Sequence, residues 1–436
     1  MILATAIFVV AYIVIASEKI HKTIVALVGA SLMLLLGIVE QEESFFSEET
    51  GIDYNVIFLL ISMMIIINIT MKTGLFQWVA IKSAKLAGGH PLRIMIILSV
   101  VTAVVSAFLD NVTTVLLIAP VTILISQALK VDPIPYLITE AIASNIGGTA
   151  TLIGDPPNIM IASKAELTFI DFVINLTPVI IVIMVAYIIS IKLIFRGRLS
   201  VSDDRRELVM QMDEREAIKD PALLRKCLFV LGLTIVGFVL HSALHLEPAT
   251  VAMGGAALLF LISREHPHDI LRDVEWPTIF FFIGLFIMVG ALVKVGLIKE
   301  LSESLLNLTQ GNLLATSMFV MWFSAFASAI VDNIPYVATM NPLVVDMGRE
   351  LWPGVEGTAL LQHEGLMPIW WSLALGACLG GNGTVIGASA NVIVAGISEK
   401  SGFPITFKRF AMYGMPLMIE SVIISAVYVW VRYYLL

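Results

Sequence analysis

Long apolar runs separated by short polar segments dominate the hydrophobic pattern of this chain. Several runs approach the roughly 20 residues that an α-helix needs to cross a bilayer. These runs cover residues 2–16, 23–39, 55–71, 172–195, 227–244, 248–263, 276–292 and 411–431. The pattern therefore predicts an all-α polytopic membrane protein. No basic residues precede the first run, so we expect a permanent span rather than a cleaved signal peptide.

The two halves of the chain carry the same motifs in the same order. Asp110 and Asp332 lie 222 residues apart within similar sequences, and Thr151 and Thr384 lie 233 residues apart. A polar insertion around 346–366 accounts for the change in spacing. Self-similarity over this length predicts two structural repeats.

We expect each repeat to contain one re-entrant hairpin and one broken helix, giving about 10 spans plus 2 hairpins. The predicted boundaries are 1–195 for the first repeat, with its hairpin at 92–129 and its broken helix at 134–163; 196–226 for a polar linker; and 227–436 for the second repeat, with its hairpin at 312–347 and its broken helix at 368–399.

The basic residues predict the orientation of the chain in the membrane. With the N-terminus outside, 21 of the 26 lysine and arginine residues, including Lys19 and Lys22, fall on the inner side. We therefore expect an inner (plasma) membrane protein with both termini outside and the linker in the cytoplasm. The repeats then have opposite orientations, which is typical of secondary transporters.

Composition excludes several other classes of protein. Hydrophobic residues make up 58% of the chain and charged residues 14%, and no nucleic-acid partner is expected. Cys227 and Cys378 lie in apolar stretches without a CxxC motif, so we expect small buried hydrophobes and no metal site. Neither a Walker loop nor the Gly-x-Gly-Asp motif of intramembrane aspartyl proteases occurs, so no enzyme and no catalytic residue is predicted.

Two aspartates lie in the middle of the predicted hairpins. A charge at membrane depth costs about 2.5 kcal/mol or more, so each is a functional candidate. Asp110 and Asp332 are followed by Asn111 and Asn333, where each hairpin turns. The alternative is that the aspartates only cap the returning helix, although a cap needs no charge.

Glycine and asparagine interrupt two further apolar helices, at 144–158 and 380–391. Unwound backbone is tolerated at membrane depth only where it is buried in protein or lines a polar cavity, so we expect these breaks to bind a substrate or an ion. Together with the hairpin tips, the candidate binding residues are Asp110, Asn111, Thr113, Thr114, Asn145, Gly147, Gly148, Thr149, Thr151, Asp155, Asn158, Asp332, Asn333, Asn382, Thr384 and Asn391.

The first break carries a charge that the second lacks, because Ala388 stands opposite Asp155. This carboxylate serves either a coupling ion or a nearby backbone N–H group, and the sequence leaves both open. Glu140, one to two turns before the break, is expected either to relay protons or to face a polar interface.

The segments 108–122, 144–158, 331–343 and 380–396 resemble signature sequences of the ion transporter superfamily, in the branch of ArsB-type arsenite permeases and the P protein. The resemblance covers nearly the whole chain. It implies a homodimer in which a mobile transport domain moves like an elevator against a scaffold. Dicarboxylate members carry Ser-Asn-Thr at each hairpin tip, whereas Asp110 and Asp332 stand in those motifs here, which argues against sodium coupling and a dianionic substrate.

We therefore expect a proton-coupled secondary transporter that exports arsenite, antimonite or a related small inorganic solute. Asp110 and Asp332, with Asp155, are expected to exchange protons for substrate. The coupling ion is expected to be H+, with Na+ as the alternative, and no cofactor is predicted. The functional alternatives are a sodium/proton antiporter and an anion channel or organic-anion transporter. Expected partners are membrane lipid, a second copy of the chain and, for an arsenite permease, an ATPase subunit.

Overall fold

A computed structural model describes residues 1–17, 19–47, 49–197 and 201–435, and the regular structure within these ranges is helical. Seven of the described helices are long and apolar enough to cross a membrane, and four shorter apolar helices accompany them. This confirms the prediction of an all-α polytopic membrane protein. Residues 198–200 of the predicted linker lie outside the described ranges.

The helices of the first half comprise apolar helices, an antiparallel pair at the predicted hairpin and an interrupted pair at the predicted broken helix. They are α1 (Ile2–Ala16), α2 (Lys22–Leu35), α3 (Gln41–Phe46), α4 (Tyr54–Met71), α5 (Leu75–Leu86), α6 (Pro91–Ser106), α7 (Asn111–Leu129), α8 (Ile134–Gly148), α9 (Pro156–Ala165), α10 (Phe169–Asn175), α11 (Thr177–Phe195) and the linker helix α12 (Asp203–Met210).

The second half repeats this succession. Its elements are α13 (Pro221–Leu240), α14 (Pro248–Ser263), α15 (Pro267–Arg272), α16 (Trp276–Lys294), α17 (Leu297–Thr309), α18 (Leu313–Ile330), α19 (Asn333–Leu351), α20 (Gly357–Leu361), α21 (Met367–Gly380), the short turn η1 (Gly381–Gly383), α22 (Ser389–Lys400), α23 (Phe407–Trp430) and the terminal turn η2 (Val431–Leu435). The hairpins are therefore α6–α7 and α18–α19, and the broken helices are α8–α9 and α21–α22.

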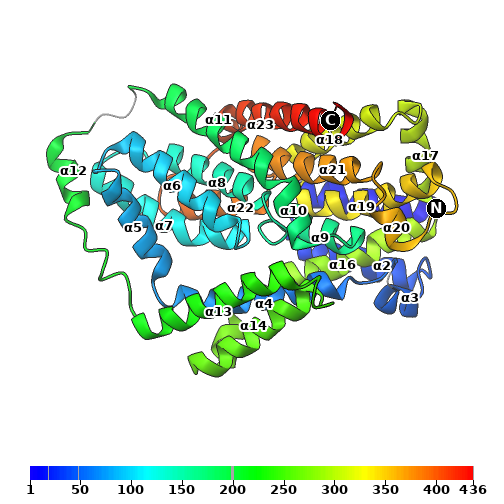
Figure 1. Ribbon diagram of the computed structural model, residues 1–436, viewed down its shortest axis with the longest axis horizontal. Helices are drawn as coiled ribbons and strands as arrows, with labels where there is room; N and C mark the ends of the chain where they lie inside the picture. Colours follow the sequence, from blue (N-terminus) through cyan, green and yellow to red (C-terminus); the bar gives the residue numbers. More distant parts are fainter. Residues whose placement is uncertain (18, 48, 198–200, 436) are drawn as a thin grey trace.

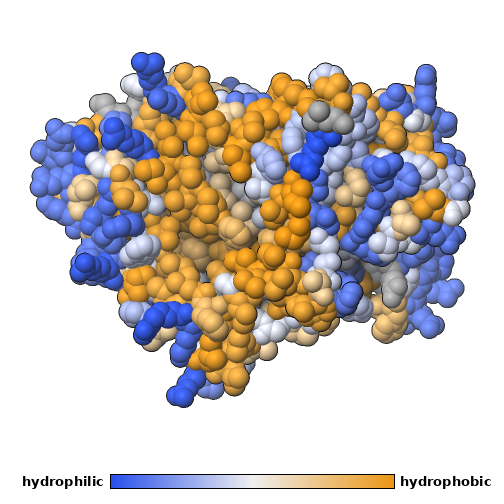
Figure 2. Space-filling view, viewed as in Figure 1, coloured by the Kyte–Doolittle hydropathy of each residue, from blue (hydrophilic) through white to orange (hydrophobic). Residues whose placement is uncertain are grey.

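The linker and the two termini lie toward opposite ends of the molecule. In Figure 1 α12 is at the left end, whereas the N-terminus, α3 and α20 are at the right, with the C-terminus also on that side. Figure 2 shows hydrophobic side chains across the middle of this face, with polar side chains gathered at both ends. We therefore expect the long axis of the view to run along the membrane normal, because this orientation places the apolar surface in the hydrocarbon layer.

The linker is shorter than predicted and is docked on α5. α13 begins at Pro221, so residues 221–226 of the predicted linker are helical. Asp220 makes this start possible, because its carboxylate accepts hydrogen bonds from two backbone N–H groups of the first turn. Lys82 and Lys85 of α5 bind Glu214 at 3.1 and 2.5 Å.

Glycines let each hairpin lie directly against its own broken helix. A methyl group on Gly147 would stand 2.0 Å from the backbone oxygen of Ala103, and one on Gly380 would stand 2.5 Å from the backbone of Ala325. A methyl group on Gly148 would collide with the backbone of the break itself. Only glycine permits this approach of α8 to α6 and of α21 to α18.

The hairpins also cross between the repeats. The returning limb α7 of the first hairpin contacts α22 of the second repeat, and α19 of the second hairpin contacts α9 of the first. Each hairpin tip therefore lies against the break of the other repeat, and this crossing assembles the site described below.

Candidate functional site

Four buried asparagine amides join the two broken helices. Nδ2 of Asn145 donates hydrogen bonds to Oδ1 of Asn382 at 2.9 Å and to Oδ1 of Asn391 at 3.0 Å. Oδ1 of Asn145 accepts one from Nδ2 of Asn111 at 3.0 Å. Nδ2 of Asn382 has no partner within the described residues although this side chain is fully buried. One amide donor of the cluster is therefore available to a ligand.

The side-chain amides of Asn158 and Asn391 hold the breaks in their unwound shape. Nδ2 of Asn158 donates to the carbonyl oxygens of Thr149 and Thr151, at 3.2 and 2.9 Å. Asn391 repeats this in the second break, where its Nδ2 lies 2.9 Å from the carbonyl oxygen of Thr384. These side chains replace the hydrogen bonds that a continuous helix would make.

The threonines of the breaks are bound to backbone rather than free. The hydroxyl of Thr151 donates to the carbonyl oxygen of Ala107 in the first hairpin, and that of Thr384 donates to Ala329 in the second. The Thr149 hydroxyl bonds a carbonyl four residues earlier in its own helix. The Thr151 and Thr384 hydroxyls connect each break to its own hairpin. All three hydroxyls already donate a hydrogen bond, so a ligand would meet them as acceptors.

Asp155 is a buried carboxylate at the start of α9. Its side chain is 1% exposed, and Nδ2 of Asn333 lies 3.3 and 3.4 Å from its two oxygens. Cys378 lies beside it, with its thiol 3.5 Å from Oδ1 of Asn158. Within the described part of the chain no lysine, arginine or histidine forms an ion pair with Asp155. A carboxylate without a counterion at this depth needs a proton or a bound cation.

Asp332 does have a cationic partner. Nζ of Lys22, at the start of α2, lies 2.7 Å from Oδ2 of Asp332 and 2.8 Å from the hydroxyl of Ser389. That hydroxyl in turn donates to Asp332 at 2.8 Å. The side chains of Lys22 and Asp332 are 24% and 12% exposed, so the pair lies at the edge of the site.

Among the described residues, the Asp110 carboxylate forms hydrogen bonds only within its own helix turn. Its carboxylate accepts from the backbone N–H group of Thr113 at 2.8 Å and from the Thr113 hydroxyl at 2.5 Å. The hydroxyl of Thr114 is buried without a partner in the described ranges. The two hairpin aspartates, equivalent in sequence, therefore differ in environment.

Four helix N-termini meet at this cluster. Asn111, Asn333 and Asn391 lie in the first turns of α7, α19 and α22, and Asp155 precedes α9. The partial positive charge of each N-terminus favours anionic or oxygen-rich groups. Aspartates precede three of these helices, whereas Ala388 precedes α22 and offers no side-chain cap.

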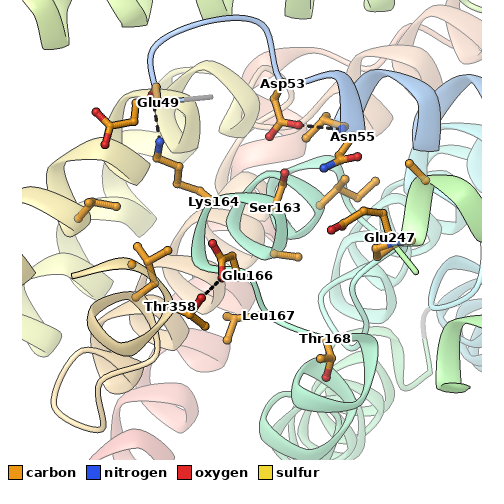
Figure 3. A pocket seen from close by; sticks show the side chains of 18 of the residues that line it. Glu49, Asp53, Asn55, Ser163, Lys164, Glu166, Leu167, Thr168, Glu247 and Thr358 are labelled. Carbon is orange, nitrogen blue, oxygen red and sulfur yellow. Dashed lines mark hydrogen bonds between the residues drawn. The ribbon is translucent and has the colours of Figure 1, made fainter. Parts of the chain in front are cut away.

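A wide vestibule opens near the first break, on the side of α3 and α20. Its volume is about 1530 Å³, and Leu152 and Ile159, on either side of Asp155 in sequence, belong to its lining. Figure 3 shows its polar wall, where Nζ of Lys164 donates to the backbone carbonyl of Glu49 at 3.0 Å. The vestibule gives the termini side of the molecule a polar approach toward the break.

The structure assigns contacts to several residues that the sequence does not single out as binding residues. The sequence indicates Lys22 only as a basic residue of the inner side, whereas its ammonium group binds Asp332 in the structure. The sequence predicts Cys378 to be a small buried hydrophobe, and in the structure it lies in the site. Its position on the helix equivalent to α8 could have indicated this. Ser389 could have been inferred from its position next to Ala388, the residue opposite Asp155. Glu420 of α23, bound to Ser190 at 2.9 Å, is an overlooked membrane carboxylate outside the site.

Comparison with known proteins identifies transporters across the whole chain. Residues 12–376 match the family described as citrate transporter (CitMHS). The chain is 48% identical to an uncharacterized transporter of Mycobacterium bovis, covering 100% of this chain and 99% of the relative. It is 46% identical to a 46 kDa membrane protein of Mycobacterium leprae, covering 99% of each. It is 32% identical to the P protein of Homo sapiens, over 99% of this chain and 60% of that protein.

Proposed function

We propose that this chain, a membrane transporter of the citrate transporter (CitMHS) family in the ion transporter superfamily, is a secondary transporter coupled to protons. Its proposed substrate is a small, oxygen-rich solute. The observation that carries this proposal is the contact between Asn333 and Asp155 beside the amide cluster of Asn145, because it places hydrogen-bonding amides next to a carboxylate that has no counterion.

The donor set supports an uncharged hydroxide of the arsenite or antimonite type as substrate. Such a solute both donates and accepts hydrogen bonds, and the site offers the free amide of Asn382 as a donor and the Asp155 carboxylate as an acceptor. Three aspartates and one lysine leave the site net negative when all are ionised, which disfavours a dianion by Coulomb repulsion.

The same charges support proton coupling. Loss of a proton from Asp155 leaves a charge at membrane depth, which is costly unless a solute donates hydrogen bonds to the carboxylate or another proton binds to it. Competition between proton and substrate for Asp155 then links their movements. Asp332 is held by Lys22, so we assign the proton to Asp155 before Asp110 and Asp332.

The crossed hairpins support movement of the site as one unit. The unit comprises α6–α9 and α18–α22, because its breaks and hairpin tips share the hydrogen bonds described above. We propose an elevator-type displacement of this unit against a scaffold that includes α4 and α14, in a homodimer in the inner membrane, with the linker in the cytoplasm.

An organic anion is the second candidate, and a specific observation favours it. Lys22 and the N-terminus of α22, which Ala388 leaves without a side-chain cap, offer positive charge next to Ser389. A carboxylate of citrate size would displace Asp332 from Lys22. The family description names citrate, and the same experiment separates the two substrates.

The test uses the full chain in proteoliposomes with an imposed pH gradient. Accumulation of arsenite that depends on the gradient and is lost in Asp155→Asn is the expected result, with Glu420→Gln as a control for loss of a membrane carboxylate elsewhere. Coupling that survives in both Asp155→Asn and the Asp110→Asn, Asp332→Asn double variant refutes the proton role. Uptake of citrate without arsenite selects the second candidate, and sodium-driven proton movement alone selects an antiporter.

A further inference from the structure

A second group of buried polar side chains lies in the first repeat, away from the breaks. Its centre is Glu140 of α8, which is 1% exposed and accepts a hydrogen bond from the hydroxyl of Thr122 on α7 at 2.6 Å. The other carboxylate oxygen, Oε2, has no partner within the described residues. A buried carboxylate with only one oxygen hydrogen-bonded is costly, so a further ligand of Oε2 is expected.

Four hydroxyl groups on the surrounding helices are also buried without a hydrogen-bond partner among the described residues. They belong to Ser99 and Thr102 of α6, Ser126 of α7 and Tyr136 of α8, each at most 1% exposed and none with a partner in the described ranges. Ser126 follows Thr122 by one helical turn, and Tyr136 precedes Glu140 by one turn, so each pair shares a helix face.

The helices that carry these groups pack against one another. α8 contacts α6, α7 and α11, and α6 also contacts α7 and α11. Tyr187 joins α11 to α8, since its hydroxyl donates a hydrogen bond to the carbonyl oxygen of Thr139 at 2.6 Å.

The second repeat has apolar residues at most of the equivalent positions. With the spacings that align the two repeats, Glu140 and Thr122 correspond to Leu373 and Val344, and Tyr136 corresponds to Ile369. Ser99 and Ser126 correspond to Met321 and Gly348, and Thr102 to Ser324. The hydroxyl of Ser324 is paired with Tyr336 at 3.0 Å. The fold therefore does not need polar groups here, which argues for a function specific to the first repeat.

We propose that Glu140 and the hydroxyls of Ser99, Thr102, Thr122, Ser126 and Tyr136 form a buried binding site for a hard monovalent cation of the sodium type. Carboxylate and hydroxyl oxygens are the ligands that hard cations select. Glu140 is the single carboxylate of the described group, so one positive charge balances it, whereas a divalent ion would leave net charge in the membrane interior. Ordered water would satisfy the hydroxyls but would leave the carboxylate charge uncompensated.

This site is separate from the proposed substrate site. Neither Asp110, Asp155 nor Asp332 contacts Glu140 among the described residues. A cation there would hold α6, α7 and α8 together and so stabilise the folded state in the absence of substrate, since a ligand that binds only the folded state raises its stability. Sodium binding at Glu140 therefore does not depend on which solute is transported.

The experiment measures thermal unfolding of the purified full chain in detergent while sodium chloride replaces choline chloride at constant ionic strength, without substrate. Sodium is expected to raise Tm with a saturable midpoint. Glu140→Gln, whose amide can still accept from Thr122, and Ser126→Ala are each expected to raise that midpoint at least tenfold. Ser425→Ala, a buried serine that bonds within α23, and Asp155→Asn are expected to leave it unchanged.

Three results would overturn the proposal. The first is a Tm that does not respond to sodium relative to choline, which would mean a protonated or hydrated Glu140. The second is an unchanged midpoint in both Glu140→Gln and Ser126→Ala. The third is loss of the sodium response in Asp155→Asn, which would place the cation at the hairpin tips. Where the unfolding transition of a variant is too broad to yield a Tm, direct binding of radioactive sodium measures its sodium affinity instead.

Discussion

The side-chain amide of Asn145 lies 2.9 Å from that of Asn382, although the two residues belong to different repeats. The same amide also bonds Asn111 and Asn391. One side chain therefore connects the first hairpin tip and both breaks, and its loss leaves several buried amides with fewer partners.

We expect Asn145→Ala to destabilise the protein by about 1–3 kcal/mol, because buried polar groups without partners cost that much, and to abolish transport. Thermal unfolding and transport in proteoliposomes measure the two effects. Asn307→Ala, on the exposed face of α17, is the matched control and should change neither. Full transport activity in Asn145→Ala would show that the amide cluster is dispensable.

Lys22→Met should lower transport by about tenfold or more, corresponding to roughly 1.4 kcal/mol, because the Asp332 carboxylate loses its ammonium partner. Asp332→Asn in the same chain removes the unpaired charge and should restore part of the rate. A double-mutant cycle of the two substitutions measures the coupling. Strictly additive effects would mean that the ion pair has no role in transport.

Gly147→Ala should destabilise the protein by at least about 1–3 kcal/mol, the usual cost of overpacking. The reason is the 2.0 Å approach of the new methyl group to the backbone of Ala103. Gly396→Ala, in α22 with open space around it, should be neutral or stabilising by up to about 1 kcal/mol. Unfolding temperatures of the two variants are compared, and equal stability would contradict the close packing of α6 and α8.

The contact between the linker and α5 should depend on pH. The Lys85 ammonium, with Lys82, lowers the pKa of Glu214 to about 2 from its ordinary 4.5. The pKa is lower when the linker is docked, so docking is fully favoured above about pH 4.5 and is lost as the pH falls toward 2.

Glu214→Gln should release the linker at neutral pH, seen as faster amide hydrogen exchange in residues 203–219. Glu216→Gln, an exposed glutamate of the same segment without an ion pair in the described structure, should leave exchange unchanged. Equal exchange in the two variants would exclude the ion pair as the docking contact.

The vestibule should be open to the outer side of the membrane. Ser163→Cys, in the vestibule lining, should react with a membrane-impermeant thiol reagent in right-side-out vesicles. Gln211→Cys in the linker should react only after the vesicles are opened, and both native cysteines are buried. The reverse pattern would invert the predicted orientation.

The sequence alone was sufficient for the class of the protein and for the order of its elements. Apolar runs of membrane length and the glycine- and asparagine-rich breaks depend on local composition, so they could be located without coordinates. The helix boundaries of the hairpins and breaks lie close to the predicted ranges. The start of α13 was placed too late because the Asp220 cap outweighs the charges of Arg225 and Lys226.

Only the tertiary structure decided which of these residues share an environment. The repeats cross, so Asn333 of the second hairpin meets Asp155 of the first break, and Lys22, distant in sequence from both, neutralises Asp332 but not Asp110. Pairwise motif symmetry predicts equal halves, whereas contacts depend on packing between distant segments. The sequence thus determined the polar groups that the membrane interior must accommodate, and the packing of the helices determined which of those groups received a partner.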